Sequence, residues 1–352
     1  MIETLLRQRN PSGVLPGDAY LAVGINVSPY IAIYKKNGDT FTRLPNPDTL
    51  PTGIVFGVVW NGSTHLCCSH TNYPYVTVYK RAGDTFTKLA NFTTNEGATL
   101  SGGRIAVNGA PGTGVSSKMA YTFTNPPRFK TVSISGDTFS VDANSATSLA
   151  ATPMLNTGVA YNVDSGSGNY LAVAVQGIRI FTQNNPPVVI SQSMPTSITV
   201  RAVATNLYDV LLTYGMTDTI RFASTSAGPT FGSYSPPTLS WVSNTPLNLA
   251  WDGYHAQFLA AASFTSGLRV EFWDTGSSFT TCTFTGTVPS PGGRGVAWSY
   301  SAILYLAFAC SVSPFIYIYK QDSHLSTAFT QLSDPDIVPE GTCNAVAFSD
   351  PI

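Results

Sequence analysis

The feature that most constrains the fold is a sequence unit that recurs along the chain. PYIAIYKKNGDTFTRL at residues 29–44 returns as PYVTVYKRAGDTFTKL at residues 74–89, which is 45 residues later. In each copy two alternating apolar runs flank a turn that contains Gly-Asp, and this pattern is typical of a β-hairpin. One short hairpin cannot bury its apolar faces alone, so a chain of such units is expected to fold by packing them against one another.

A second part of the unit shows how often it occurs. Another apolar run, such as AYLAV at residues 19–23, precedes the hairpin. In the later copies a short motif stands in front of that run, and it consists of an apolar pair followed by an aromatic or small residue. The motif occurs as VVW (58–60), IAV (105–107), VAY (159–161), VAT (203–205), LAW (249–251), VAW (296–298) and VAF (346–348). A repeat length in the mid-forties of residues, with four short strands in each repeat, is typical of a β-propeller blade. The sequence therefore predicts an all-β, seven-bladed β-propeller with four-stranded antiparallel blades.

The two ends of the chain carry complementary fragments of the unit. Residues 19–21 begin a second run with no first run before it, and residues 344–348 form a first run with no second run after it. We expect the C-terminal strand to join blade one, which closes the ring and removes an exposed sheet edge. This predicts one propeller domain over residues 18–352, preceded by an N-terminal arm over residues 1–17.

The recurring residues are interpreted as structural. Hard cations need six or more oxygen ligands at one place, whereas each Gly-Asp turn offers a single carboxylate, from Asp39, Asp84 or Asp137. Aromatic residues that recur at one equivalent position favour packing between adjacent sheets. Small residues beside them would ease crowding near the ring axis. The aromatic residues are Trp60, Tyr161, Trp251, Trp298 and Phe348, and the small residues are Ala160, Ala250, Ala297 and Ala347.

Composition argues against two classes of partner. Charged residues make up 11 % of the chain and the net charge is −1, whereas a typical soluble domain has about 25 % charged residues. A duplex-binding surface needs clustered Lys and Arg, so no nucleic-acid partner is expected. An apolar run of 18 residues is absent from the sequence, so no membrane insertion is expected. Five irregularly spaced cysteines predict buried thiols rather than a disulfide framework.

Patterns of catalytic or metal-ligating residues are not evident in the sequence. The histidines His65, His70, His255 and His324 lack ligand spacing, and the glutamates beyond Glu3 (Glu96, Glu271 and Glu340) form no obvious pair. The sequence therefore predicts a non-enzymatic protein with no catalytic residue, no cofactor-binding residue and no metal site. Hydrolysis of a surface polysaccharide stays open as an alternative, because a ring brings together residues that are distant in sequence.

The repeat resembles a known group of proteins. The unit A-Y-L-A-V-x-x-x-x-S-P-Y-I-x-I-Y-K-x-x-G-D-T-F-T-x-L, with G-V-A-W/F before it, is similar to the WD40-like propeller repeats of tailed-bacteriophage and prophage proteins. The likeness is specific in repeats one, two and seven and weaker through residues 145–290, and the Gly-His and Trp-Asp signatures of eukaryotic WD40 proteins are missing. The resemblance implies a virion component, such as a tail, tail-tip, head–tail or capsid-associated protein, and brings no catalytic motif.

Two non-catalytic functions are expected, the first from that resemblance and the second from the proline–aromatic loops and the irregular copies four to six. The first is a rigid docking propeller that binds other virion proteins and resides in the virion after assembly in the host cytoplasm, with Leu5 and Leu6 anchoring the N-terminal arm. The alternative is adhesion to a host-surface glycan or envelope protein. Its expected contact residues lie beside prolines in the loops between the second and third runs. They are Tyr30, Tyr73, Tyr75 and Phe315.

Overall fold

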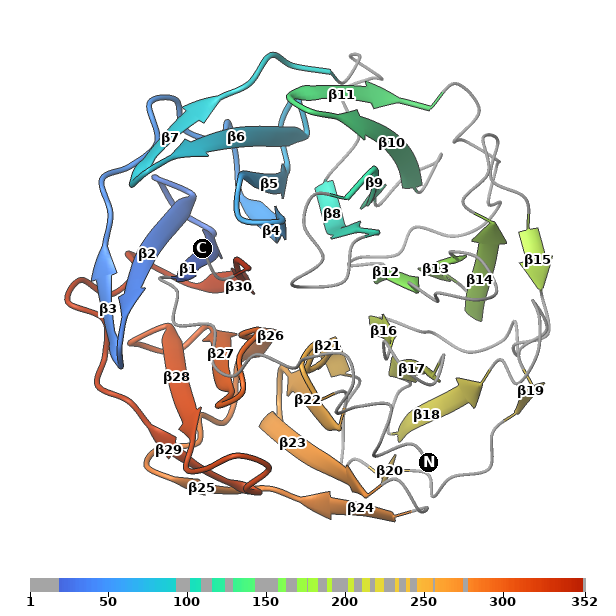
Figure 1. The fold of residues 1–352 in the computed structure, drawn as a ribbon, viewed down its shortest axis with the longest axis vertical. Helices are drawn as coiled ribbons and strands as arrows, with labels where there is room; N and C mark the ends of the chain where they lie inside the picture. The colour runs from blue at the N-terminus through green and yellow to red at the C-terminus, as the bar shows by residue number, and fades with distance from the viewer. Residues whose placement is uncertain are drawn as a thin grey trace.

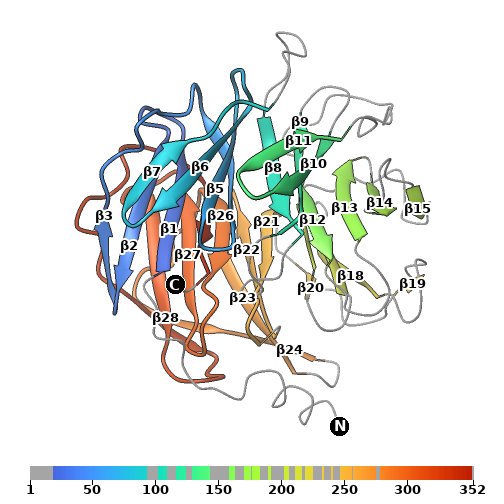
Figure 2. The ribbon, with the colours of Figure 1, turned by 45° about the horizontal axis from the view of Figure 1, so that its top comes forward.

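A computed structural model gives the fold of the chain. It describes residues 19–92, 102–108, 116–123, 129–142, 158–162, 170–175, 177–182, 189–191, 202–205, 211–215, 219–224, 232–233, 239–240, 246–255, 257–274 and 278–350. Every regular element in these residues is a β-strand, and the strands form seven sheets. The sheets are arranged around a common axis (Figure 1), and each sheet stands beside the next around the ring (Figure 2). The predicted all-β propeller is confirmed, with one sheet for each of the seven predicted blades.

Blades one to three each have four strands, which follow one another from the ring axis outward. Blade one contains β30 (Cys343–Phe348), β1 (Ala19–Ile25), β2 (Ile31–Asn37) and β3 (Thr40–Arg43). Blade two contains β4 (Val55–Asn61), β5 (His65–His70), β6 (Val76–Ala82) and β7 (Thr85–Lys88). Blade three contains β8 (Gly102–Val107), β9 (Lys118–Phe123), β10 (Phe129–Ser135) and β11 (Thr138–Val141).

Blades four to seven follow the same order. Blade four contains β12 (Val159–Asn162), β13 (Tyr170–Val175), β14 (Gly177–Thr182) and β15 (Val189–Ser191). Blade five contains β16 (Ala202–Thr205), β17 (Leu211–Gly215) and β18 (Thr219–Ser224), and β18 pairs with both β19 (Gly232–Ser233) and β20 (Leu239–Ser240). Blade six contains β21 (Pro246–Trp251), β22 (Phe258–Ser263), β23 (Gly267–Asp274) and β24 (Ser278–Thr281). Blade seven contains β26 (Gly293–Trp298), β27 (Tyr305–Cys310), β28 (Ile316–Gln321) and β29 (Ala328–Gln331), and β25 (Thr283–Thr285) pairs with β29 in parallel.

The last strand closes the ring, as the sequence predicts. Strand β30 pairs antiparallel with β1, and Val346 lies opposite Val23 in the register. Beyond the paired stretch, the amide of Ser349 donates to the carbonyl of Tyr20 over 2.8 Å. The innermost strand of blade one therefore comes from the end of the chain, while the other three strands come from its beginning.

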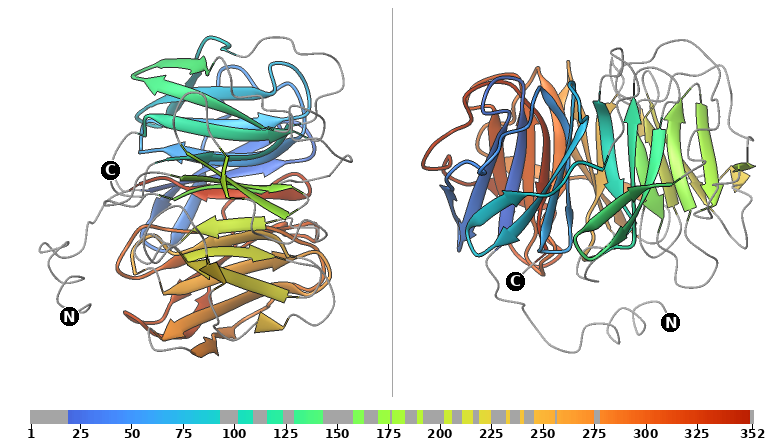
Figure 3. Two further views of the ribbon diagram at one scale, coloured as in Figure 1. Left: turned by 90° about the vertical axis from the view of Figure 1, so that its right-hand side faces the viewer. Right: turned by 90° about the horizontal axis from the view of Figure 1, so that it is seen from above.

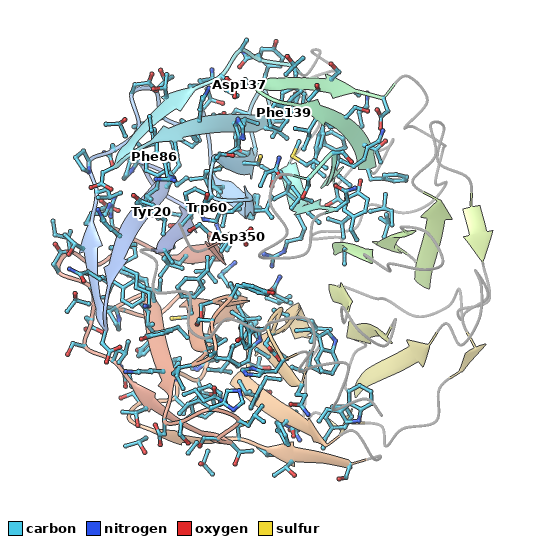
Figure 4. The ribbon with its side chains drawn as sticks, viewed as in Figure 1. Tyr20, Trp60, Phe86, Asp137, Phe139 and Asp350 are labelled. Carbon is cyan, nitrogen blue, oxygen red and sulfur yellow. The ribbon has the colours of Figure 1, made fainter. Side chains whose placement is uncertain are left out.

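The core lies between neighbouring blades. At the junction of blades one and two, Tyr20, Trp60 and Phe86 pack with ring centroids 5.9 to 6.0 Å apart (Figure 4). The equivalent residues Phe258, Trp298 and Phe329 pack in the same way at the junction of blades six and seven. Because each of these two aromatic clusters takes its members from two sheets, the blades at these junctions bury part of their apolar faces against a neighbour. The predicted role of the recurring Trp residues is confirmed at these two junctions.

The Gly-Asp turns combine a local and a long-range role. Gly38, Gly83 and Gly136 take φ values of +58°, +59° and +57°, which glycine adopts without steric cost. The aspartate that follows each glycine bonds to the preceding blade: Asp137, for example, accepts from His65 Nε2 over 2.9 Å. The turn residues are therefore structural, as predicted, and they also join blades.

Candidate functional site

The innermost strands enclose a cavity on the ring axis. They run along the thickness of the disc (Figure 3). Between them is a space of about 320 Å³, near the lower end of the range for small-molecule sites. The middle residue of the three-residue motif lines it in six blades, and the prediction of small residues near the axis is confirmed. These residues are Val59, Ala106, Ala160, Ala250, Ala297 and Ala347.

The Arg104 side chain closes one end of this cavity. Its Nη1 donates to the carbonyls of Phe56 and Asn344, both over 3.1 Å, and its Nη2 donates to those of Leu247 (3.2 Å) and Arg294 (2.9 Å). These four carbonyls belong to β4, β30, β21 and β26. One guanidinium from blade three therefore binds the inner strands of four other blades across the axis and forms the floor of the cavity.

The floor carries a positive charge that no carboxylate among the described residues pairs with. Arg104 is 9 % exposed, and within the described residues it forms no ion pair and its Nε has no hydrogen-bond partner. Burial lowers the pKa of Arg104 to about 10, and the nearby positive charge of Arg294 contributes to this shift. The group remains protonated at neutral pH. Four carbonyl dipoles alone compensate this buried cation within the described part of the chain.

Aromatic side chains line the opposite end of the cavity. Two of them are held between blades, because Trp60 Nε1 donates to the carbonyl of Ala347 over 3.2 Å and Trp298 Nε1 donates to that of Ala250 over 3.1 Å. These bonds join blade two to blade one and blade seven to blade six. The aromatic end therefore has a rigid wall. Its members are Trp60, Tyr161, Trp251, Trp298 and Phe348.

A carboxylate lies at this aromatic end. Asp350 is two residues beyond the end of β30, is partly buried and lines the cavity. Figure 4 shows it close to the centre of the ring. The cavity thus has a fixed cation at one end and a carboxylate at the other, and a mostly small and apolar wall between them. A carboxylate can accept a proton from water, and a guanidinium can hold a negatively charged group.

The contact residues predicted from the proline loops do not form one surface. Tyr73 is 44 % exposed, but Tyr75 is only 5 % exposed and packs edge-to-face on Phe123 with ring centroids 6.3 Å apart. Tyr30 and Phe315 are partly buried against the blade cores. The prediction of an exposed ring is therefore wrong for Tyr75, whose ring is buried in the apolar cluster between blades two and three. Leu5 and Leu6 of the predicted arm lie outside the described residues.

The five cysteines and His70 are buried. Cys67, Cys68, Cys282, Cys310 and Cys343 are buried free thiols, as predicted. Burial lowers the pKa of His70 to about 4, and its Nε2 contacts Thr77 Oγ1 over 2.9 Å. Among the described residues, no group of three or more His, Cys, Asp or Glu side chains could hold a metal ion. A helix long and apolar enough to cross a bilayer is likewise not found in that part of the chain.

Sequence reasoning missed both charged residues of the cavity. Arg104 directly precedes the IAV motif of blade three, and Asp350 follows the VAF motif at the end of the chain. The available signal was a charge next to an inner strand in a chain with 11 % charged residues. Motif spacing could not reveal the pair, because the two residues belong to different blades.

Comparison with known proteins identifies propellers of similar shape. No family model matches the chain, and no curated relative matches it. A solved structure from Bacteroides uniformis, named a 6-phosphogluconolactonase, has a TM-score of 0.68 at 13 % identity and covers 94 % of this chain and 99 % of its own. One of the same name from Bacteroides fragilis has a TM-score of 0.67 at 13 % identity and covers 95 % of this chain and 99 % of its own. The periplasmic gluconolactonase of Pseudomonas aeruginosa has a TM-score of 0.66 at 11 % identity, covering 95 % and 100 %.

These matches correct two predictions made from the sequence. The sequence predicted a non-enzymatic bacteriophage structural protein, with adhesion as its alternative. That prediction is wrong, because the chain matches propellers named as lactonases. The physical reason is that low charge and repeated blades belong to the propeller architecture and do not distinguish structural proteins from enzymes. The resemblance to phage repeats, the virion partners and the virion localisation stay predictions. At 11 to 13 % identity the matches show the fold, and the chain is an all-β propeller.

Proposed function

We propose that the chain is a hydrolase that opens a small sugar-acid lactone in the axial cavity. The observation that carries this proposal is that one cavity has the Asp350 carboxylate at one end and the Arg104 guanidinium at the other. The cavity volume of about 320 Å³ suits a hexose-sized ligand. Propellers named as lactonases match 94 to 95 % of this chain, which supports the choice of reaction.

The proposed reaction uses Asp350 as a general base. The carboxylate takes a proton from a water molecule while the water oxygen bonds to the lactone carbonyl carbon. The bond between that carbon and the ring oxygen then breaks, and the proton passes from Asp350 to the ring oxygen. The products are a carboxylic acid and a hydroxyl group, so one water is consumed and the carboxylate is regenerated. General-base catalysis of this kind contributes typically about 10²- to 10⁴-fold to the rate.

A rate measurement on the full chain tests the proposal. Lactone hydrolysis releases acid, so a pH-stat can follow the opening of glucono-δ-lactone and 6-phosphogluconolactone above the spontaneous rate. Asp350→Asn should lower kcat at least about 100-fold, because the amide cannot accept the proton. Asp334→Asn is the matched control, since Asp334 is exposed in the connection before β30. No hydrolysis of either lactone by the unaltered protein, or an undiminished rate in Asp350→Asn, would show that the proposal is wrong.

A further inference from the structure

We infer that two copies of this chain associate face to face through the end of the ring that carries the Arg104 floor. The inference does not depend on the proposed function, because the Asp350 end of the cavity lies at the opposite end of the inner strands. Three observations support it. They are the place of the exposed apolar side chains, the order of the loops that carry them, and the scarcity of charge in these loops.

Strand alternation divides the loops between two faces of the ring. Within each blade the strands are antiparallel, so the turn between the second and third strands lies on the same face as the connection that enters the blade. We call this face, which is also the Arg104 end, the loop face. In blades six, seven, one and two its described segments are residues 26–30, 44–54, 71–75, 264–266, 286–292, 311–315 and 332–342.

Exposed apolar side chains gather on the loop face. Among the described residues, eight large apolar side chains are exposed, by 37 to 57 %. Leu325, in the turn between β28 and β29, lies on the opposite face. Such a one-sided distribution is typical of an interaction surface. The seven side chains on the loop face are Val27, Tyr73, Phe264, Val288, Val312, Ile337 and Val338.

The exposed apolar area is comparable to what a dimer requires. At about 100 Å² for a whole aliphatic side chain and about 200 Å² for an aromatic one, the seven side chains expose roughly 400 Å². A standard interface buries about 800 Å² on each partner, and about 57 % of that area is apolar. One loop face therefore supplies nearly the apolar share of one interface. A second copy related by a two-fold axis supplies an equal surface.

Backbone hydrogen bonds join the loops of blades six and seven into one surface. The amide of Gly292 donates to the carbonyl of Phe264 over 2.5 Å, and the amide of Ser311 donates to the carbonyl of Gly292 over 2.9 Å. These bonds connect the turns of the two blades through the segment that carries Val288. In blade one, the amide of Asn26 likewise donates to the carbonyl of Thr342 over 3.0 Å.

The turns of blades one, two and seven are also ordered internally. The carbonyls of Val27, Asn72 and Val312 each accept a hydrogen bond from the amide three residues later, over 2.7 to 2.8 Å. The exposed side chains of Val27, Tyr73 and Val312 therefore stand on ordered backbone. Association then costs little additional conformational entropy, because these loops are already fixed.

Charges on the loop face are few and acidic. None of its described segments contains lysine, arginine or histidine, and their charged residues are Asp48, Asp334, Asp336 and Glu340. Asp48 and Asp336 accept hydrogen bonds from backbone amides of the outermost strands β7 and β3, so they lie at the rim. An anionic membrane or a nucleic acid would require basic residues. Apolar loops inside a polar rim instead match the anatomy of a protein interface.

Sedimentation velocity of the full chain tests the association. Interfaces of this size associate at micromolar concentration or below, so between about 1 and 100 μM we expect a shift from the mass of the 37.4 kDa chain to twice that mass. A single species with the mass of one chain across this range would overturn the inference. The occupant of the loop face would then be a different protein.

Substitutions on the two faces locate the contact. Phe264→Glu and Val312→Glu each place a carboxylate in the apolar contact, so each should raise the dissociation constant of the dimer at least about tenfold. Leu325→Glu is the matched control, since it places the same charge on a similarly exposed side chain of the opposite face. It should leave the constant unchanged. Equal weakening by all three variants, or no weakening by the first two, would refute the loop face as the contact.

Distances between spin labels test the orientation without altering the apolar side chains. All five native cysteines are buried, so Ser313→Cys and Ser323→Cys each provide an exposed thiol for labelling. Ser313 precedes β28 on the loop face and Ser323 follows it on the opposite face, roughly 20 Å away along the strand. Pulsed paramagnetic resonance should therefore give a shorter distance between copies for Ser313→Cys than for Ser323→Cys. Equal distances, or the reverse order, would show that the copies do not meet through the loop face.

Discussion

The hydroxyl of Tyr20 donates a hydrogen bond to Asp84 Oδ1 over 2.6 Å and thereby joins blade one to blade two. Lys35 Nζ reaches the other oxygen of the same carboxylate at 3.2 Å. Blades seven and one repeat the arrangement, since Tyr305 and Lys320 bind Asp39 over 2.7 and 2.8 Å. In blades two and three, His65 takes the place of the tyrosine and Lys80 that of the lysine, with Asp137 as acceptor. We call each arrangement a blade latch.

The first prediction is that the blade latches contribute to stability. Asp84→Asn keeps the size of the side chain but removes its charge, so the Lys35 contact loses its ionic component and the Tyr20 bond is weakened. The carboxylate is partly exposed, so we expect a loss of about 1 kcal/mol in the free energy of unfolding. Urea denaturation measures this difference. Asp334→Asn should leave the midpoint unchanged, and an equal effect of both changes would contradict a specific latch.

The second prediction concerns pH. The hydrogen bond from Tyr20, followed by that from Lys35, lowers the pKa of Asp84, and bonds from Lys80 and His65 lower the pKa of Asp137. Burial by itself would raise the pKa of Asp39, but the bonds from Lys320 and Tyr305 outweigh it and the pKa is lowered. All three carboxyls thus have folded pKa values below the unfolded value of about 3.9.

The sign of the effect follows from these shifts. Latch stabilisation is fully present above the unfolded pKa and is lost as the pH falls through the lower folded pKa. The gap in melting temperature between the unaltered protein and the double variant Asp39→Asn, Asp84→Asn, whose latches contain no histidine, should be constant between about pH 5 and pH 7 and should shrink below about pH 4. Thermal scans across this range provide the measurement. A gap that widens as the pH falls would refute the assignment.

The third prediction is that Arg104 holds the ring together at its axis. Arg104→Met removes four hydrogen bonds and leaves their acceptor carbonyls without this donor. We expect the free energy of unfolding to fall by about 3 kcal/mol, since charged hydrogen bonds and buried unsatisfied groups are each costly. Arg104→Lys should lose less, because the charge remains but the planar fork of donors does not. Similar unfolding curves for Arg104→Met and the unaltered protein would contradict the stabilising role of Arg104 at the ring axis.

The fourth prediction addresses ring closure. Ala347→Pro removes a backbone donor from β30 at its pairing with Ala22 and is incompatible with this strand pairing. We expect a loss of about 3 kcal/mol or more, seen as a lower melting temperature and greater protease sensitivity. Ser333→Pro, in the exposed connection between β29 and β30, is the control for the proline itself. Normal melting of Ala347→Pro would mean that the closing strand contributes little.

The amino-acid sequence by itself determined the repeating architecture. Spacing of the motif from residue 58 to residue 348 gave the blade number, and the incomplete units at the two ends gave the pairing of β30 with β1. The same repetition identified the aromatic residues between blades and the small residues on the axis. Such features can be predicted because strand alternation and turns are local sequence patterns, and these patterns recur from one repeat to the next.

Only the tertiary structure decided which residues meet. The repeat gave no reason to connect Arg104 of blade three with carbonyls of four other blades, or with Asp350 at the far end of one cavity. It likewise could not assign Asp84 a partner in Tyr20, because the turn and the strand belong to different blades. Closing the ring brings inner-strand residues from all sides to a common axis. That convergence depends on the angle between packed sheets, which no local pattern in the chain encodes.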